Sequence, residues 1–536
     1  YSENVATQET EKANADPTEG LSVEEKIHWQ ILHRKKDGIE DLLNEALTRR
    51  GPVDILNNVL LPAMKDVGDK FGAGELILPF VLQSAEVMKK AVARLETYLE
   101  KTEGQTKGKV VLATVYGDVH DIGKNLVNTI LTNNGYTVVD LGKQVPVNTI
   151  IEKAEEIGAD AIGLSALLVS TSKQMPLCAQ ELYRRGLRYP LLVGGAAINP
   201  SFVRSAAIVD PEAAVVYPAG MFYCKDAFEG LAVMDRLQAP DERESFVRRH
   251  NEEMLERQRK YEEAKAKAKD LRPASRQNGG VPPADVPTPP FWGIKVLDLP
   301  VDEVVACVDL NTLYRMQWGA KNLKGEEWER LLREEFEPRL QRYTREARTQ
   351  GWLRPRAVYG YFPAGREGNE VVVFDPVDHD RELGRFYFPR QEDREELSLA
   401  DYFRPLEDGR PADVVALQVV TSGHVAEQFV KQRQVDGDYS EGYFLHGFSV
   451  QTAEGAAELV NRRIKEELGI GNGRGLRYSW GYPACPDIEQ HGLLFRILPV
   501  EETIGVTLTA AYQLNPEQST AAIVVHHPAA KYFSAA

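Results

Sequence analysis

Residues 109–123 read KVVLATVYGDVHDIG, and this stretch decides the fold that we predict. A short apolar run leads directly into a turn that carries Asp118 and His120 between two glycines. The next residues place apolar side chains at helical spacing, so the segment predicts a strand, a loop and a helix. Ligands of open parallel sheets bind beyond the carboxyl ends of the strands, which makes Asp118 and His120 candidate site residues.

Four further apolar runs follow this one, with helical patterns between them: YTVVDLG, DAIGLSAL, PLLVGGA and AAVVYPAG. Short Val/Ile/Leu-rich runs that alternate with helices predict βαβ units and a parallel sheet buried on both faces. We therefore expect a Rossmann-like (flavodoxin-like) five-stranded parallel α/β domain over residues 105–238. The first turn has no GxGxxG pattern, so a dinucleotide ligand has little support.

The flanking segments differ in composition and predict a multidomain α/β protein. Residues 1–20 are polar and unpatterned, as in a linker, and residues 21–104 carry the i, i+3, i+4, i+7 apolar spacing of a helical bundle. Residues 239–290 hold a charged run, interpreted as a solvated helix laced with salt bridges, and then a proline-rich extended linker. Residues 291–536 mix amphipathic helices with a predicted hairpin, so we expect an α+β domain.

The amino-acid composition argues against several classes of function. The 536 residues include 64 Lys and Arg against 80 Asp and Glu, a net charge of −16 that argues against binding nucleic acid or membrane surfaces. No apolar run reaches the roughly 20 residues that span a bilayer. The four cysteines form no CxxC pair, which argues against a disulfide scaffold and suits the reducing cytoplasm. The sequence begins with Tyr1, so we expect a piece of a longer protein.

His120 is a candidate metal ligand. A neutral imidazole binds transition metals well, and a carboxylate two residues away, Asp118, can fix its tautomer and raise its basicity. One protein nitrogen does not make a metal site alone. We therefore expect a metal that brings its other ligands with it, as the metal of a macrocycle does.

Three short motifs carry a resemblance. Residues 118–123 match the D-x-H-x-x-G signature of cobalamin-binding domains, residues 165–167 match their S-x-L, and residues 194–195 match their GG, each at a predicted strand end. The resemblance implies cobalamin, as methylcobalamin, with His120 as lower axial ligand of cobalt. Asp118 would accept a hydrogen bond from the imidazole, and the hydroxyl of Thr171 would complete the relay, in place of the serine of the family's methionine synthases.

The same resemblance implies a wider set of cofactor contacts. The bundle segment KDVGDKFGAGELILPFVLQSAEVMKK looks like the cap that covers the upper face of the corrin, although its spacing alone favours plain bundle core. Val169 stands where related enzymes can carry a threonine. The implied cofactor-binding residues are Phe71, Leu78, Gly117, Asp118, Val119, His120, Asp121, Ile122, Gly123, Ser165, Leu167, Val169, Gly194, Gly195, Ala219 and Met221.

The C-terminal part carries a second resemblance. Residues 477–487, RYSWGYPACPD, are similar to the R-x-x-x-G-Y-P-A-C-P segment of the reactivation domain of cobalamin-dependent methionine synthases, as are HHPAAKYF, FYFPRQ with LADYF, and the pair at 308–309. That domain binds S-adenosylmethionine. The resemblance implies that Arg477 binds the methionine carboxylate of this ligand and that Asp309 binds its ammonium group. It also implies that Tyr482 orders the site and that Tyr532 and Phe533 form the aromatic pair of the tail.

The resemblance runs from Leu21 to Phe533 and implies the cobalamin-binding and reactivation portion of such an enzyme. In the intact enzyme, cobalamin would carry methyl from methyltetrahydrofolate to homocysteine. This portion would reductively remethylate cob(II)alamin with S-adenosylmethionine and an electron from a flavodoxin-like donor. The homocysteine and folate modules, with their zinc, are missing from the sequence. We expect a cytoplasmic monomer.

Other users of the same cofactor fit the sequence less well. A corrinoid carrier protein would end near Leu237, and a cobalamin-dependent light sensor would add a basic helix-turn-helix. An adenosylcobalamin isomerase would need a barrel for its substrate. Binding of S-adenosylmethionine by the piece from Phe291 onward distinguishes these alternatives.

Overall fold

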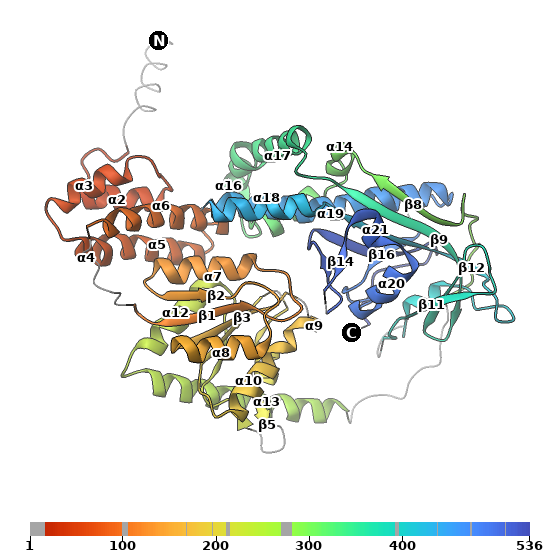
Figure 1. The fold of residues 1–536 in the computed structure, drawn as a ribbon, viewed down its shortest axis with the longest axis horizontal. Helices are drawn as coiled ribbons and strands as arrows, with labels where there is room; N and C mark the ends of the chain where they lie inside the picture. Colours follow the sequence, from red (N-terminus) through yellow and green to blue (C-terminus); the bar gives the residue numbers. More distant parts are fainter. Residues whose placement is uncertain are drawn as a thin grey trace, which may run out of the picture.

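The computed structural model describes residues 17–98, 106–167, 169–195, 197–210, 215–269, 281–391, 396–436, 438–471, 474–509 and 511–535. These residues form a helical bundle, a sheet domain and a C-terminal domain, in that order along the chain (Figure 1). The multidomain α/β class predicted from the sequence is confirmed.

The bundle follows the predicted helical spacing. Its first helix starts at a capping box, in which Ser22 and Glu25 each bond the other's backbone N–H. Its core buries apolar side chains that recur on one face of each helix, including Ile27, Leu43 and Met88. Its helices are α2 (Val23–Leu32), α3 (Ile39–Leu47), α4 (Pro52–Ile55), η1 (Leu56–Leu60), α5 (Leu61–Gly72) and α6 (Leu78–Glu96).

In the sheet domain, five described strands pair in parallel in the order β2-β1-β3-β4-β7. Helices α7 and α12 cover one face of this sheet, and α8, α10 and α11 cover the other. The strands are β1 (Lys109–Thr114), β2 (Thr137–Asp140), β3 (Ala161–Ser165), β4 (Leu191–Gly194) and β7 (Met221–Tyr223). The helices are α7 (Ile122–Asn133), α8 (Val147–Ile157), α9 (Val169–Ser172), α10 (Gln174–Arg184), α11 (Pro200–Ala206) and α12 (Ala227–Gln238).

The predicted fifth strand is wrong in one respect. The run AAVVYPAG supplies only β6 (Val215–Val216), which pairs antiparallel with β5 (Ile208–Asp210) in a separate ribbon. The strand that joins the sheet is β7, after the turn at Gly220. Both runs are apolar. In AAVVYPAG, Pro218 has no backbone N–H to pair with a neighbouring strand, so this run does not form a longer strand.

The predicted charged helix is α13 (Arg243–Lys269), and part of it packs on the sheet domain instead of being solvated all round. Phe246 stacks on Phe222 with 5.1 Å between ring centroids, and the His250 ring lies 4.3 Å from the same phenyl ring. His250 Nε2 also donates to the Met221 carbonyl at 2.9 Å. The helix is therefore an outer layer of the sheet domain.

The described part of the predicted proline-rich linker lies on the C-terminal domain. The carbonyl oxygens of Ala284 and Asp285 accept hydrogen bonds from Arg404 and Arg474, at 2.7 and 2.6 Å. Residues 270–280 of the predicted linker and residues 1–16 of the N-terminal one lie outside the described residues.

The C-terminal domain is built on an antiparallel sheet. Its described strands run in the order β11-β10-β9-β12-β16-β13, with β8 also paired to β9, and the predicted hairpin is β9–β10. The strands are β8 (Gly293–Asp298), β9 (Arg356–Glu367), β10 (Glu370–Phe374), β11 (Glu382–Tyr387), β12 (Asp413–Thr421), β13 (Leu476–Ser479) and β16 (Ser519–Val525), with the ribbon of β14 (Thr507–Leu508) and β15 (Leu514–Asn515) beside them.

The helices of this domain lie around that sheet. The longest is α19, which packs along one face of the sheet. The helices are α14 (Val301–Val305), α15 (Leu310–Thr312), η2 (Leu313–Gln317), α16 (Gly325–Leu331), η3 (Leu332–Phe336), α17 (Glu337–Gln350), η4 (Leu399–Tyr402), α18 (His424–Val435), α19 (Tyr439–Glu467), η5 (Ile488–Gln490), α20 (His491–Ile497) and α21 (Val500–Ile504).

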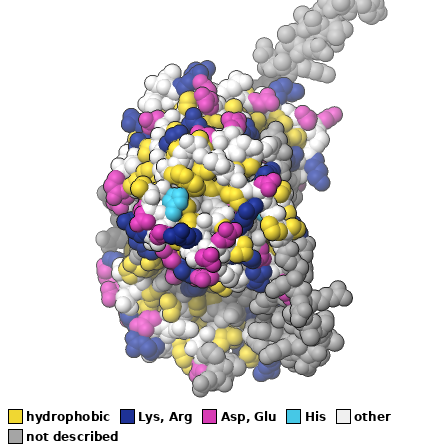
Figure 2. Space-filling view, turned by 90° about the vertical axis from the view of Figure 1, so that its right-hand side faces the viewer, with side chains coloured by type: hydrophobic (Ala, Val, Ile, Leu, Met, Phe, Trp, Pro, Cys, Tyr) yellow, Lys and Arg dark blue, Asp and Glu magenta, His cyan; other side chains and the backbone are white. Residues whose placement is uncertain are grey.

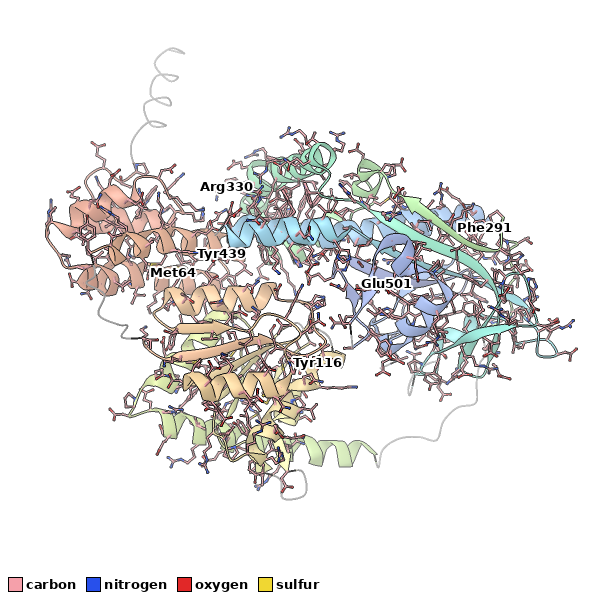
Figure 3. The ribbon with its side chains drawn as sticks, in the orientation of Figure 1. Met64, Tyr116, Phe291, Arg330, Tyr439 and Glu501 are labelled. Carbon is pink, nitrogen blue, oxygen red and sulfur yellow. The ribbon has the colours of Figure 1, made fainter. Side chains whose placement is uncertain are left out.

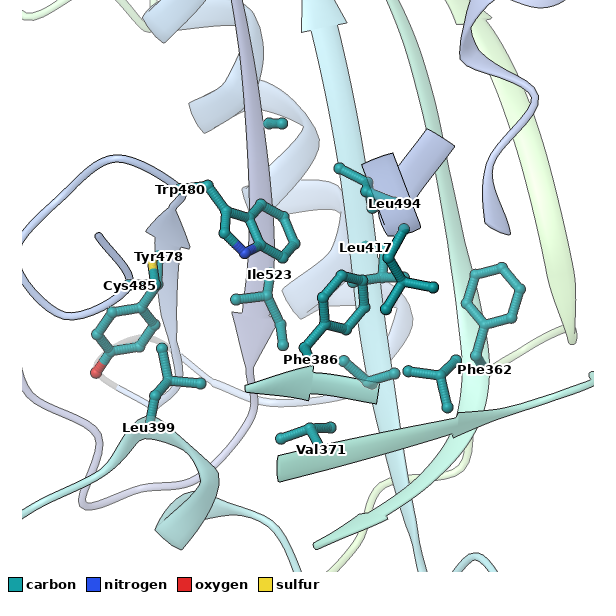
Figure 4. Close-up of a cluster of buried hydrophobic side chains, with 14 of the residues drawn as sticks. Phe362, Val371, Phe386, Leu399, Leu417, Tyr478, Trp480, Cys485, Leu494 and Ile523 are labelled. Atoms are coloured by element: carbon teal, nitrogen blue, oxygen red, sulfur yellow. The ribbon is translucent and has the colours of Figure 1, made fainter. Parts of the chain in front are cut away.

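The opposite face of the sheet carries the main core of the domain (Figure 4). Leu417 on β12 lies among Phe362, Phe386 and Ile523, which come from three other strands. Viewed from its outer end, the domain presents acidic and basic side chains interspersed with apolar ones (Figure 2). The sheet is therefore buried on both faces, and the charge is spread over the outside.

All three domains touch one another. Bundle residue Phe71 lies 5.8 Å from Phe228 on α12, measured between ring centroids. Bundle residue Ile77 is buried in a cluster of the C-terminal domain that includes Trp318. A loop between α21 and β16 reaches the turn after β1, where Thr509 donates to the Gly117 carbonyl at 3.1 Å. The turn that carries His120 therefore lies at a domain interface.

We expect Leu417→Ala to destabilise the C-terminal domain by about 2–5 kcal/mol, because it opens a cavity in a fully buried core. The measurement is calorimetric thermal unfolding. Val377→Ala is the control, since Val377 is 91% exposed. A loss below 1 kcal/mol for Leu417→Ala would mean that this core relaxes freely around the missing atoms.

Candidate functional site

His120 lies in the turn between β1 and α7, at the carboxyl edge of the parallel sheet. Gly117 opens the turn with a φ of +81°, a backbone conformation that side chains with a Cβ rarely adopt. A Cβ at Gly117 would also lie 2.5 Å from the Cβ of Ala511, in the C-terminal domain. Tyr116 precedes the turn and lies at the edge of the sheet domain that faces the C-terminal domain (Figure 3). Only glycine fits at position 117 in this arrangement.

Asp118 holds the imidazole of His120 in place. Its Oδ1 accepts a hydrogen bond from His120 Nδ1 at 2.7 Å, and its Oδ2 accepts one from Thr171 Oγ1 at 2.6 Å. The backbone N–H of Leu167 donates to the same Oδ2 at 2.8 Å. Asp118 is fully buried. The structure thus brings together the three residues of the predicted relay, His120, Asp118 and Thr171.

The electrostatics of this relay favour a charged carboxylate. Burial alone would raise the pKa of Asp118, but the hydrogen bonds from His120 and Thr171 lower it to about 2. Burial alone would lower the pKa of His120, but Asp118 and Glu517 raise it above its ordinary value. With Nδ1 donating to Asp118, Nε2 is the nitrogen left to face a ligand.

The group that faces Nε2 comes from the C-terminal domain and was not predicted. Glu517 Oε2 lies 4.0 Å from His120 Nε2, and Glu517 Oε1 contacts His446 Nε2. Burial alone would raise the pKa of Glu517, but His446 and His120 hold it below its usual value. Nothing in the sequence around Glu517 marks it, because its role depends on a contact between residues 397 positions apart in the chain.

Gln513 makes a second contact with the same turn. Its Oε1 accepts from the Val119 N–H at 3.2 Å. Its Nε2 is buried and bonds no other described residue. An unpaired buried amide N–H suits an amide or carbonyl oxygen of a bound molecule, because leaving it unpaired costs roughly 1–3 kcal/mol. Sequence reasoning missed this residue too.

A cavity of about 430 Å³ extends from this edge into the sheet domain, between the sheet and helices α7 and α12. Its wall includes Gly163, Ser165 and Gly194, and a Cβ at Gly163 or Gly194 would lie 2.2 or 2.8 Å from a neighbouring heavy atom. Bundle residues Phe71 and Leu78 line the same cavity. The shape is an apolar slot that can hold a planar or elongated group.

The other predicted cofactor residues divide into two groups. Val119 and Asp121 continue the His120 turn, Ile122 and Gly123 begin α7, Leu167 follows β3, Val169 begins α9, and Gly195 follows β4. At Gly195, φ is +124° and a Cβ would lie 2.0 Å from the Ala166 carbonyl oxygen. These residues lie at the carboxyl edge; nothing is described of the side chains of Ile122 and Val169.

Ala219 and Met221 do not belong to this edge, which corrects the prediction. Met221 pairs in register with Leu191, the first residue of β4, and therefore lies at the amino end of its strand. The error follows from assigning the fifth strand to AAVVYPAG. The residues that line the cavity at the carboxyl end of β7 are Tyr223, Cys224, Lys225 and Asp226.

A second constellation lies on the C-terminal domain, around Arg477 on β13. Its Nη2 pairs with Glu454 Oε2 at 2.7 Å, and its Nη1 donates to Ser479 Oγ at 3.1 Å. The backbone carbonyl of Arg477 accepts a hydrogen bond from Tyr532 at 3.2 Å. Tyr482 follows Gly481, whose φ is +90°, and is 57% exposed. The site is open to solvent on this side.

Helix α19, which carries Glu454, also packs against the segment that leads to Asp309. The next residue, Gly455, is so close to α14 that a Cβ there would lie 2.8 Å from the Val304 carbonyl and 3.0 Å from Val308. Val308 directly precedes Asp309, which is exposed and caps α15. Asp309 thus follows a residue that packs against the helix of Glu454, while Phe533 packs against the domain core. The sequence signal for Glu454, an acid beside a glycine in a helix, was too weak to single out.

The donor set suits a metal that arrives with its own ligands. Within the residues that the structure describes, no group of three or more His, Cys, Asp or Glu side chains could hold a metal ion. A single imidazole with a carboxylate behind it, a glycine-lined slot and an unpaired amide fit a macrocycle with a tail. Separately, no described helix is both long and apolar enough to cross a bilayer.

Family comparisons match all three domains. Two family models described as B12 binding domain match residues 23–96 and 108–230, and one described as Vitamin B12 dependent methionine synthase, activation domain, matches residues 322–536. A crystal structure of the MetH reactivation domain bound to AdoHcy is similar over 47% of this chain and 84% of that one, with 23% identity and a TM-score of 0.42.

Whole-chain relatives agree with these matches. Methionine synthase of Mycobacterium tuberculosis is 39% identical over 559 residues, and that of Mycobacterium leprae is 39% identical over 566 residues. Each alignment covers 96% of this chain and 46% of the relative, so the chain spans about half the length of the curated relatives that it matches. Over almost its whole length the chain is therefore similar to the vitamin B12-dependent methionine synthases, in their two B12 binding domains and their activation domain.

Proposed function

We propose that this chain binds cobalamin through His120 and, in the arrangement seen here, restores its methyl group from S-adenosylmethionine. The observation that carries the proposal is the position of Glu517 and Gln513. These residues bring the C-terminal domain into contact with the His120 turn. When bound, cobalamin supplies a cobalt centre that, after one-electron reduction, takes a methyl group from the sulfonium and leaves S-adenosylhomocysteine.

His120 has two partners that exclude each other. A neutral Nε2 can bind a metal, whereas a protonated Nε2 can pair with Glu517, 4.0 Å away. Because the pKa of His120 is raised, the stabilisation from this pair is fully present below the ordinary histidine value of about 6.5 and is lost as the pH rises through the raised value. Asp118 serves both states, since it accepts from Nδ1 in each.

The Arg477 constellation would hold S-adenosylmethionine. A guanidinium suits the carboxylate of the methionine part, and the carboxylates of Glu454 and Asp309 suit the ammonium and the sulfonium. Tyr532 closes one side with an exposed ring. Methyl transfer needs the donor placed in line with the acceptor, and no side-chain base, so positioning is what these residues supply.

The wider setting is also part of the proposal. We propose that the bundle covers the corrin through Phe71 and Leu78 during turnover, and that homocysteine and folate modules elsewhere in the intact enzyme use the same upper face. We further propose a flavodoxin-like electron donor, a monomer and a cytoplasmic location. The acidic balance of the chain, −16 overall, supports the absence of nucleic-acid and membrane partners.

The direct test loads the chain with cobalamin and supplies labelled S-adenosylmethionine and a chemical reductant. We expect label on cobalamin and one S-adenosylhomocysteine for each methyl transferred, read by chromatography. Product formed without protein at the same rate, or no product with loaded protein, would refute the proposal.

We expect Asp118→Asn and Glu517→Gln each to lower the pKa of His120, because each removes a charge that raises it. The measurement is an NMR pH titration of labelled histidine in the cofactor-free chain. His250 serves as an internal control, since it contacts neither residue and its titration should not move. An unchanged His120 titration in both variants would mean that burial alone sets its pKa.

Arg477→Ala should weaken binding of S-adenosylmethionine by about 2 kcal/mol, because it leaves the ligand carboxylate without its charged partner. Calorimetric titration measures the affinity. Arg410→Ala is the matched control, because Arg410 pairs with Asp380 at an exposed position of the same domain. Equal affinities of the wild type and Arg477→Ala would place the clamp elsewhere.

His120→Gly should remove the protein nitrogen from cobalt and leave much of the slot contact intact. Optical and EPR spectra of the loaded chain report the axial nitrogen. His379→Gly, at an exposed position of the C-terminal domain, should leave the spectra unchanged. The assignment fails if the His120→Gly spectra keep the same nitrogen ligand.

A further inference from the structure

The bundle has an extensive contact with the C-terminal domain, at the start of α6. Ile77 is only 4% exposed and lies in a cluster with Trp318 and Phe444, and Phe80 packs against the same cluster. Figure 3 shows Tyr439, the first residue of α19, where the bundle meets the C-terminal helices. Lys89 on α6 donates to the Tyr439 hydroxyl at 3.1 Å. The contact therefore combines an apolar centre with polar bonds.

A buried carboxylate lies at the edge of this contact. Glu86 on α6 is 5% exposed. Its Oε1 accepts a hydrogen bond from the backbone N–H of Ser440 at 2.7 Å, and its Oε2 pairs with Lys36 Nζ at 2.5 Å. A buried charge is costly unless it is paired and hydrogen-bonded, and here one of its two partners belongs to another domain.

Ser440 is in the first turn of α19, which is the longest described helix of the chain, at 29 residues. Asp438 stands at its N-cap, but no described cap hydrogen bond comes from that side chain. The first N–H groups of a helix have no intrahelical acceptor and carry a partial positive charge. Glu86 thus supplies from the bundle the cap that α19 does not obtain from its own sequence.

The surrounding charges are complementary. A polar cavity of about 510 Å³ lies at this junction, with Arg34 and Lys36 on the bundle side. On the other side it is lined by Glu334, Glu335 and Asp438, besides Glu441, which is paired with Arg339 at 2.7 Å. The guanidinium of Arg34 also lies 4.3 Å from the ring centroid of Phe80. Bundle cations therefore face C-terminal acids.

We propose that this surface of the C-terminal domain, formed by Trp318, Phe444 and the first turn of α19, is a docking site for the bundle when it is displaced from the corrin, and that Glu86 selects this arrangement by capping α19. The inference rests on the proposed role of the bundle as a cofactor cap. Residues at the start of α6 contact both the docking site and the cofactor slot. Ile77 and Phe80 are in the docking site, whereas Leu78 between them faces the cofactor slot.

This contact acts on the balance between two arrangements. In the proposed arrangement in which the bundle covers the corrin, Ile77 and Phe80 would lie outside the aromatic cluster, and the Ser440 N–H would bond water in place of Glu86. The docked arrangement gains these contacts only when the bundle is displaced, so they shift the population toward the state in which the C-terminal domain reaches His120. The docking site thereby favours reactivation without touching S-adenosylmethionine.

The test measures docking first in the cofactor-free chain, by hydrogen exchange and mass spectrometry of peptides from the first turn of α19. We expect Glu86→Ala to make these amides exchange about fivefold faster, because it removes a helix cap. Glu86→Gln keeps an acceptor oxygen and should show a smaller effect. Glu45→Ala is the matched control, because Glu45 is an exposed bundle glutamate of α3 that pairs with Arg49. Circular dichroism verifies that each variant is folded.

The second measurement is the rate of labelled methyl transfer to cobalamin in the loaded chain. Faster exchange in Glu86→Ala together with a several-fold slower methyl transfer supports the inference. Unchanged exchange overturns it, as does methyl transfer at the wild-type rate in a variant whose exchange has changed. If the wild-type chain transfers no methyl at all but exchange changes as expected, the docking site stands and the proposed function fails.

Discussion

The hydrogen bond between Asp118 and His120 is the constraint on which the site depends. At 2.7 Å, with the carboxylate fully buried, it fixes which imidazole nitrogen faces outward. A buried carboxylate needs several donors to remain charged, and Thr171 and the Leu167 N–H supply them from the next strand end. Loops after β1 and β3 are thereby tied together, so the cofactor edge of the sheet is rigid where the metal would bind.

The outward nitrogen, His120 Nε2, therefore has more than one possible partner. In the proposed function, a metal and Glu517 compete for this nitrogen, and the bundle and the C-terminal domain compete for the space above it. The chemistry would then depend on which domain is docked. Under the further proposal, Glu86 affects that competition through its hydrogen bond with the first turn of α19.

Glycine residues allow segments of the chain to approach one another closely. At Gly117 the C-terminal domain approaches to within van der Waals contact of the turn, at Gly195 a carbonyl oxygen fills the place of a Cβ, and at Gly455 two segments of the C-terminal domain touch. Each of these close approaches leaves no room for a Cβ. The domains meet through backbone as much as through side chains, as in the bond from Thr509 to the Gly117 carbonyl.

The sequence by itself predicted the parallel sheet and the Asp118–His120 pair, because strand periodicity and a motif at a strand end are local signals. Thr171 came from the resemblance to cobalamin-binding domains. It misplaced the fifth strand, and with it Ala219 and Met221, because two apolar runs lie close together and only pairing partners choose between them. Tertiary structure alone decided Glu517, Gln513, Glu454 and Glu86. Glu517, Gln513 and Glu86 contact residues of another domain, and Glu454 contacts a strand 23 positions away in its own domain, so none of these partners can be read from the local sequence.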